Sequence, residues 1–98
     1  MKSIYKYELT PEIDNNFSIP GMGPILHVGP DPRNVPCMWV AVDTERPNVN
    51  IKVLLVGTGW PIDFLGEMEE DWIFAGTFKD DIYMWHVFYA NALDRSDE

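Results

Sequence analysis

The sequence has very little cysteine, few basic residues and no long hydrophobic run. Its 98 residues include one cysteine, Cys37, so no disulfide within the chain can hold the fold, and a reducing cytoplasm is the expected compartment. Lys and Arg number 7 against 16 Asp and Glu, a net charge of −9, which argues against a protein that neutralises nucleic-acid phosphates. No stretch reaches the roughly 18–20 apolar residues of a membrane span, and the first residues lack the apolar segment of a signal peptide.

The negative charge is concentrated in the second half of the chain. Up to Lys52, five bases and six acids nearly balance, whereas from Val53 onward two bases face ten acids. Such a surface repels phosphates and attracts a basic protein surface. The alternative is that the charge serves solubility alone.

A chain of this length supports one core. A domain of this size buries roughly 60% of the surface that its unfolded chain exposes, which is enough to fold alone. Neither an internal repeat nor a linker divides the sequence. We therefore expect one β-rich domain over residues 1–90, followed by an acidic tail over residues 91–98.

Hydrophobic patterning predicts a mainly β protein. Tyr5, Tyr7 and Leu9 alternate with charged residues, as in a strand with one buried face. Apolar runs that predict further strands cover residues 25–28, 37–42, 49–56, 72–78 and 82–89. Short turns join several of these runs, so the expected fold is a small antiparallel sheet, curled or barrel-like. The one helical feature expected is a short turn near residues 61–66, with Pro61 at its first position.

Aromatic residues and the cysteine supply candidate core positions. Trp39 and Trp85 lie within predicted strands and are expected in the core, because each large ring buries much apolar surface. Cys37 is expected to be a small buried side chain. Trp60 follows a glycine-rich turn, and its position leaves core and contact surface equally open.

Several short motifs follow one another in a recognisable order. They are Ile25-Leu26-His27-Val28, Trp39-Val40-Ala41-Val42-Asp43, Val56-Gly57-Thr58-Gly59, Gly76-Thr77-Phe78 and Trp85-His86-Val87-Phe88. In this order the chain resembles a small domain family of unknown function found in bacteriophages and their bacterial hosts, over about residues 4–88. The resemblance implies a phage-type origin and a compact β fold, and it implies no catalytic residue.

The residue types that carry metal or nucleophile chemistry are scarce. His27, His86 and Cys37 are the only nitrogen and sulfur donors of the usual metal-binding types, and they stand at no known ligand spacing. Nothing beside Cys37 supplies a positive charge that would activate its thiol. We expect no metal, no cofactor and no enzymatic activity.

The second half instead predicts a protein-binding surface. Acidic residues there are interleaved with apolar residues of the kind that anchor interfaces. The candidate partner surface consists of Glu67, Met68, Glu69, Glu70, Asp71, Trp72, Asp80 and Asp81. Together with the resemblance, this surface favours a non-enzymatic phage-type protein that inhibits a host defence system or host machinery. It would act in the host cytoplasm by binding a protein with a basic surface, without direct contact to nucleic acid or membrane.

An alternative function is a nucleotide-binding sponge. Gly57-Thr58-Gly59 is not a P-loop, because no lysine follows it and Pro61 lacks an N–H, but its amides and the Trp60 ring could hold a base by stacking. Phosphates would then be met by Arg33, Arg46 or Lys52. Because a chain this small has little room for a pocket, such a protein would sequester a nucleotide immune signal as an oligomer.

Overall fold

The computed structural model describes residues 1–11, 15–62 and 72–91. The strands are β1 (Lys2–Glu8), β2 (Asn15–Pro20), β3 (Ile25–Pro30), β4 (Pro36–Asp43), β5 (Asn48–Gly57), β6 (Ile73–Asp80) and β7 (Tyr83–Asn91). The described residues contain no helix, and hence none long and apolar enough to cross a membrane.

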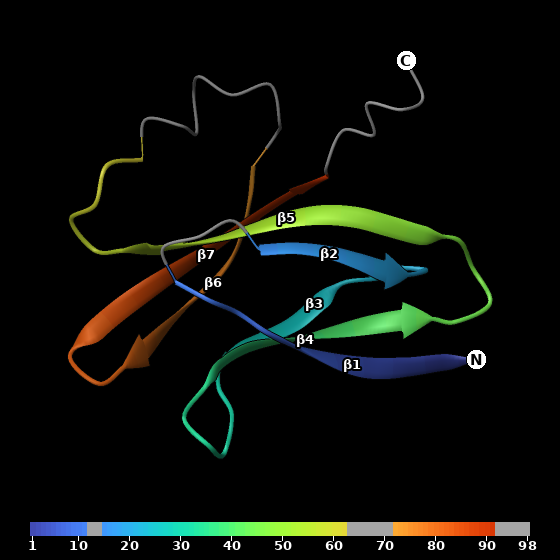
Figure 1. Cartoon of the computed structure of the whole chain (residues 1–98), viewed down its shortest axis with the longest axis horizontal. Coiled ribbons are helices and arrows are strands. Elements are labelled where there is room, and N and C mark those ends of the chain that lie inside the picture. The colour runs from blue at the N-terminus through green and yellow to red at the C-terminus, as the bar shows by residue number, and fades with distance from the viewer. Residues whose placement is uncertain (12–14, 63–71, 92–98) are drawn as a thin grey trace.

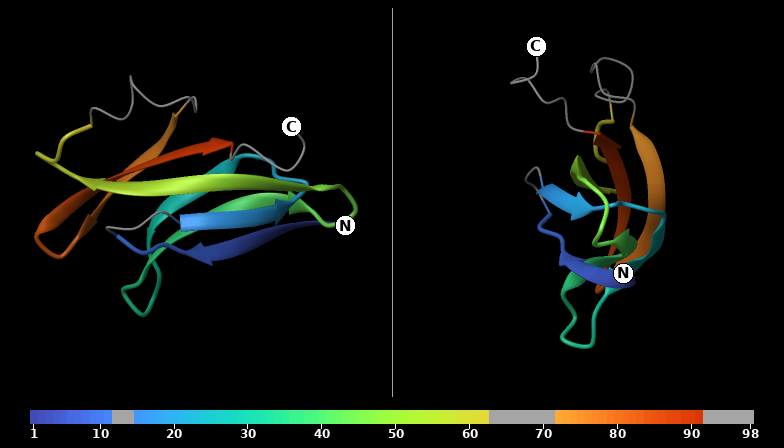
Figure 2. Two further views of the ribbon diagram at one scale, coloured as in Figure 1. Left: turned by 45° about the horizontal axis from the view of Figure 1, so that its top comes forward. Right: turned by 90° about the vertical axis from the view of Figure 1, so that its right-hand side faces the viewer.

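The strands form two antiparallel sheets (Figures 1 and 2). One sheet has the order β1-β4-β3 and the other the order β2-β5-β7-β6. The β3–β4 and β6–β7 pairs are hairpins within one sheet, whereas the chain changes sheet between β1 and β2, between β2 and β3, and between β4 and β5. As a result, the β6–β7 turn and the turn after β5 lie at one end of the molecule, and the β4–β5 turn and the N-terminus lie at the other (Figure 1).

The two sheets share one hydrophobic core. Met38 and Val40 of β4 are fully buried, as are Val53 of β5 and Val87 of β7. These residues recur at every second position of their strands, which places them on the face that each strand turns inward. The core members are Leu9, Ile19, Val28, Met38, Val40, Val42, Ile51, Val53, Leu55, Phe78, Trp85 and Val87.

The sheets approach each other most closely where β3 lies against β6. Gly76 stands at a register irregularity of β6 with a φ of 153°. A Cβ built on it would lie 2.7 Å from Cγ2 of Val28. Glycine at this position therefore allows the two strands to meet.

The prediction of a small antiparallel β protein is confirmed. The chain differs from the expected curled sheet in forming two sheets, and these are not closed into a barrel. Residues 61 and 62 are not helical, and the rest of the helical turn expected near 61–66 lies outside the described residues, as does the part of the predicted acidic tail from residue 92 on.

The sequence pattern did not predict β2. This strand has only two apolar side chains in six residues, Phe17 and Ile19. It pairs with β5 over its whole length. At its start, the Asn15 side chain accepts a hydrogen bond from the Thr10 N–H (2.8 Å) and donates to the carbonyl oxygens of Thr10 (2.9 Å) and Val53 (3.3 Å). These bonds satisfy a buried amide, and nothing in the local sequence reveals them.

Candidate functional site

The predicted acidic surface is only partly within the described residues. Asp80 ends β6 and Asp81 follows it in the β6–β7 turn, and Trp72 is half-buried just before β6. The remaining members, Glu67, Met68, Glu69, Glu70 and Asp71, lie outside the described residues. Their role in binding stays a prediction.

The β6–β7 turn carries Ile82, the most exposed large apolar side chain among the described residues. Asp80 pairs with Tyr83, so the turn itself is Asp81 and Ile82. Asp81 adopts a φ of 58°, a conformation that aspartate tolerates better than most residues. Ile82 is 86% exposed, Tyr83 54% and Met84 43%.

The turn after β5 places Trp60 beside this hairpin. The ring of Trp60 meets that of Trp85 edge to face with centroids 5.3 Å apart, and Tyr83 lies 5.7 Å from Trp85 on the same strand. A Cβ on Gly57 would lie 3.0 Å from the Trp60 ring, so a side chain at this position would press on the indole. The Thr58 N–H donates to the Met84 carbonyl oxygen at 3.2 Å and ties the two turns together.

The exposed apolar residues at these two turns are called the tip patch: Trp60, Ile82, Tyr83 and Met84. Asp80 and Asp81 flank it on the hairpin. The sequence analysis named Trp60 and the two aspartates, but in different hypothetical sites. The sequence pattern did not predict that Ile82 of the turn and Tyr83 and Met84 of β7 lie at the surface, because an apolar run does not reveal which of its side chains stay exposed.

His86 lies beside the patch with both ring nitrogens hydrogen-bonded. Nε2 is 2.7 Å from the Thr58 hydroxyl and Nδ1 is 2.9 Å from that of Thr77. Both ring nitrogens therefore have a hydrogen-bond partner among the threonine hydroxyls. The imidazole is a satisfied structural group that links β7 to β6 and to the turn after β5.

The three cations proposed for a nucleotide site do not gather at Trp60. Arg33 lies in the β3–β4 loop, where its guanidinium contacts Glu8 at 2.7 Å and Asp31 at 3.3 Å. Arg46 lies in the turn before β5, and the ten residues of that strand separate it from Trp60 by roughly 30 Å. Lys52 lies midway along β5.

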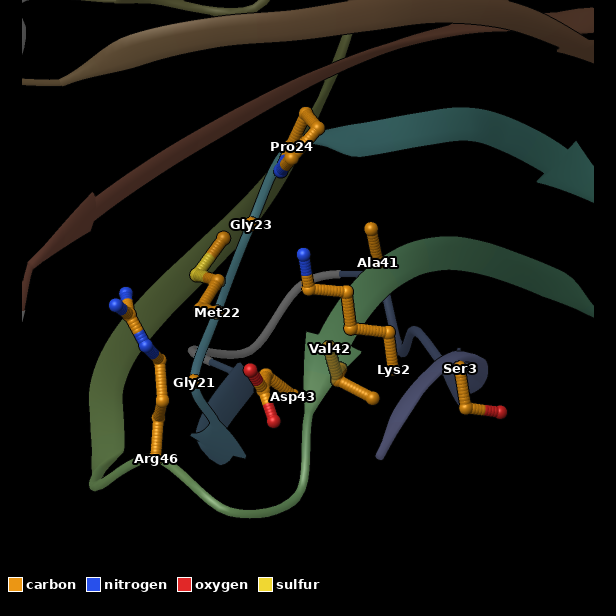
Figure 3. Close-up of a pocket in the computed structure, with 10 residues that line it drawn as sticks. All are labelled: Lys2, Ser3, Gly21, Met22, Gly23, Pro24, Ala41, Val42, Asp43 and Arg46. Carbon is orange, nitrogen blue, oxygen red and sulfur yellow. The ribbon is translucent and has the colours of Figure 1, made fainter.

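Arg46 instead borders a hollow at the opposite end of the molecule (Figure 3). The hollow has a volume of about 470 Å³ and lies between β1, the end of β4 and the β2–β3 connection. Its lining consists of Lys2, Ser3, Gly21, Met22, Gly23, Pro24, Ala41, Val42, Asp43 and Arg46. Among the described residues, neither Lys2 nor Arg46 has an ion-pair partner within 4.0 Å.

The backbone of the β2–β3 connection shapes the wall of the hollow. Gly21 has a φ of 47°, and a Cβ there would lie 2.5 Å from the carbonyl oxygen of Asp43. The Gly23 N–H donates to the Ala41 carbonyl oxygen at 2.8 Å. The carboxylate of Asp43 accepts the Glu45 N–H, and this bond lowers the pKa of Asp43.

Of the lining residues, Arg46 alone was predicted from the sequence as a binding residue. A glycine-rich stretch at Gly21 and Gly23, bounded by two prolines, was the available signal for a special backbone. Lys2 comes to Arg46 through the pairing of β1 with β4, which no local pattern shows.

Cys37 lies inside the protein beneath the β3–β4 loop. Its side chain is fully buried, which confirms the expected small core residue. Burial, together with the nearby charge of Asp31, raises the pKa of the Cys37 thiol, so the thiol keeps its proton and is a poor nucleophile. Within the described ranges, no three His, Cys, Asp or Glu side chains are grouped to hold a metal ion.

Comparison with known proteins shows the family of this chain. A family model described as a domain of unknown function, DUF7352, matches residues 1–97, and the chain belongs to that family. No curated protein and no solved structure matches the chain. The family assignment agrees with the resemblance in being an uncharacterised small domain.

Proposed function

We propose that this chain is a non-enzymatic binding protein that docks on a partner protein through the tip patch. The observation that carries the proposal is the run of three exposed apolar side chains at 82–84 beside the exposed Trp60. Single exposed apolar residues are ordinary, but a contiguous exposed patch marks an interaction surface.

The geometry of the patch suits an interface anchor. Trp60 and Tyr83 both lean on the buried Trp85 at ring separations below 6 Å. Rings held in place lose little conformational freedom when a partner covers them, and Trp and Tyr are the residues that contribute most at interface centres. The patch is thus preorganised for binding.

Charge indicates what kind of partner fits. Asp80 and Asp81 border the patch, and the whole chain carries −9. A partner with a basic rim around an apolar pocket is therefore attracted and oriented, and its association weakens with added salt. The resemblance to a phage-type family further supports a host protein as this partner and the host cytoplasm as the place of action, with inhibition of a defence system or other host machinery as the outcome.

The first prediction concerns Ile82. Because its side chain is 86% exposed, Ile82→Ser is expected to leave the melting temperature within about 2 °C. In affinity capture from host lysate followed by titration of the purified partner, the same change is expected to weaken binding about 10-fold or more. Asp81→Lys is expected to weaken binding most at low salt.

The matched control is Leu26→Ser, an exposed leucine of β3 that is 51% exposed and lies outside the tip patch. It removes a similar apolar side chain without touching the proposed surface. A partner bound equally by the native chain, Leu26→Ser and Ile82→Ser would show that the patch is not the docking site.

A second function is favoured by the hollow at the other end. Lys2 and Arg46 border about 470 Å³ of open space and have no ion-pair partner in the described part of the chain. Cations with free hydrogen-bonding capacity bind phosphate or carboxylate groups. The hollow thus supports sequestration of a small anionic ligand such as a nucleotide, the alternative function, at a different place from the Trp60 turn.

The second prediction tests this ligand site directly. In an NMR titration with pyrophosphate, the amide signals of Gly21 to Gly23 are expected to shift. Arg46→Ala is expected to weaken this binding about 10-fold, because one charge-assisted contact is lost. Lys79→Ala, an exposed lysine of β6, removes the same charge elsewhere and is expected to change nothing. Equal affinity in the two variants would exclude the hollow as the site.

A further inference from the structure

β1 is an edge strand whose outer side is suited to pairing with another strand. It is last in the order β1-β4-β3, and no described strand hydrogen-bonds to its other side; in Figure 1 it runs along the lower border of the molecule. Its register with β4 is continuous from Lys2 to Glu8, and it contains no proline. Regular edge strands of this kind are templates for pairing with another strand.

The hydrogen bonds to β4 show which backbone groups of β1 remain free. The Leu9 N–H donates to the Pro36 carbonyl oxygen at 2.8 Å, and the Thr44 N–H donates to that of Met1 at 2.9 Å. Because hydrogen-bonded and non-hydrogen-bonded pairs alternate along an antiparallel ladder, the odd-numbered residues of β1 bond to β4. The N–H and carbonyl groups of the even-numbered residues point to the open edge: Lys2, Ile4, Lys6 and Glu8.

These free groups restrict how β1 could pair with itself. Even-numbered residues must face even-numbered residues of the second strand. A register centred on Tyr5 sets Lys2 opposite Glu8 and Ile4 opposite Lys6 of the other copy, and it uses every free group. The neighbouring registers set Lys2 opposite Lys6 or Lys6 opposite itself, and like charges directly opposite are destabilising.

We propose that β1 pairs antiparallel with β1 of a second copy of this chain, centred on Tyr5. The two three-stranded sheets then become one continuous sheet. The pairing covers Ile4 and Tyr5, which are 59% and 38% exposed. It also sets Lys2 opposite Glu8 of the other copy on both sides of the two-fold axis.

The ion pairs already present are compatible with this dimer. Lys2 has no ion-pair partner among the described residues. Arg33 contacts Glu8 through Oε2 at 2.7 Å, which leaves Oε1 for Lys2 of the second copy. One short strand from each copy makes a small interface, so the dimer is expected to be weak. Its dissociation constant is expected to lie in the range of about 10 µM to 1 mM.

The test uses sedimentation equilibrium of the full chain over that concentration range. The native chain is expected to show a monomer–dimer equilibrium. Lys2→Glu and Glu8→Lys each set two like-charge pairs opposite one another and are expected to weaken the dimer about 10- to 100-fold. An equimolar mixture of these two variants restores opposite charges at both positions and is expected to dimerise like the native chain.

A backbone variant gives an independent readout. Ile4→Pro removes an N–H that points to the open edge and none that bonds to β4, so it is expected to abolish the dimer while the monomer stays folded. Hydrogen exchange of the Ile4 and Lys6 amides is expected to slow as native protein concentration rises. A native chain that stays monomeric, an unaffected Lys2→Glu dimer, or a mixture that fails to associate would each overturn the proposal. Protection of these amides at monomer mass would also overturn it, since another segment would then cover the edge.

Discussion

Replacing Gly76 by alanine is expected to lower the free energy of unfolding by about 2–4 kcal/mol and the melting temperature by roughly 10–20 °C. Two causes add. A φ of 153° is unfavourable for any side chain, and the new Cβ would lie 2.7 Å from Cγ2 of Val28. Val28 is 5% exposed and β-branched, so it cannot turn away at low cost. Urea unfolding followed by tryptophan fluorescence measures the loss.

Two further variants separate the causes. Gly59 has a φ of 92° and no atom within 4 Å of a built Cβ, so Gly59→Ala carries conformational strain alone and is expected to cost about 1 kcal/mol. Val28→Ala makes room, and combined with Gly76→Ala it is expected to cost about 1–2 kcal/mol less than the two single changes together. Strict additivity would mean that β3 and β6 do not meet at this contact.

The strands could be predicted where one face of the pattern is buried. The alternation in residues 5–9 and the apolar runs that became β3, β4, β5, β6 and β7 are local signals, and they identified all strands except β2. The partition into two sheets could not be predicted, because it depends on where the chain crosses over. The expected curled sheet contains these strands except β2, in one sheet and not in two.

The candidate surfaces were predictable only in fragments. Trp60 was named, but its contact with Trp85 arises from the pairing of β5 with β7, which sets Gly57 opposite Trp85. Likewise, Arg46 was named without Lys2. Contacts that join distant segments carry no periodicity, so a single sequence shows the residue types of a surface and not its assembly.

The last prediction concerns Asp31, whose carboxylate anchors the β3–β4 loop. Its side chain is fully buried. Oδ1 accepts the N–H groups of Arg33 (2.8 Å) and Val35 (3.0 Å), while Oδ2 contacts Nζ of Lys6 at 3.1 Å and the guanidinium of Arg33 at 3.3 Å. Asp31→Asn replaces one oxygen by an NH₂ group that can only donate, and thus sets a donor against other donors. We expect a melting temperature roughly 5–10 °C lower near neutral pH.

The pH dependence of the melting temperature shows whether Asp31→Asn acts through the lost negative charge or through the changed shape of the side chain. The backbone N–H of Val35 contributes most to lowering the pKa of Asp31, followed by hydrogen bonds from Lys6 and Arg33. A lowered pKa in the folded state means that the unfolded chain binds the proton more readily, so the carboxylate stabilises the fold above the unfolded pKa of about 3.9 and progressively less below it. The difference in melting temperature between the native chain and Asp31→Asn is therefore expected to shrink between pH about 5 and pH about 2.

A matched variant shows whether this behaviour belongs to Asp31. Asp81→Asn makes the same chemical change at an exposed turn residue, and asparagine accepts its φ of 58° as readily as aspartate does. Its melting temperature is expected to follow that of the native chain at every pH. If the Asp31→Asn difference were instead constant as pH falls, the loop would depend on the shape of the side chain and not on its charge, because protonation of the native carboxyl removes the same negative charge as the substitution.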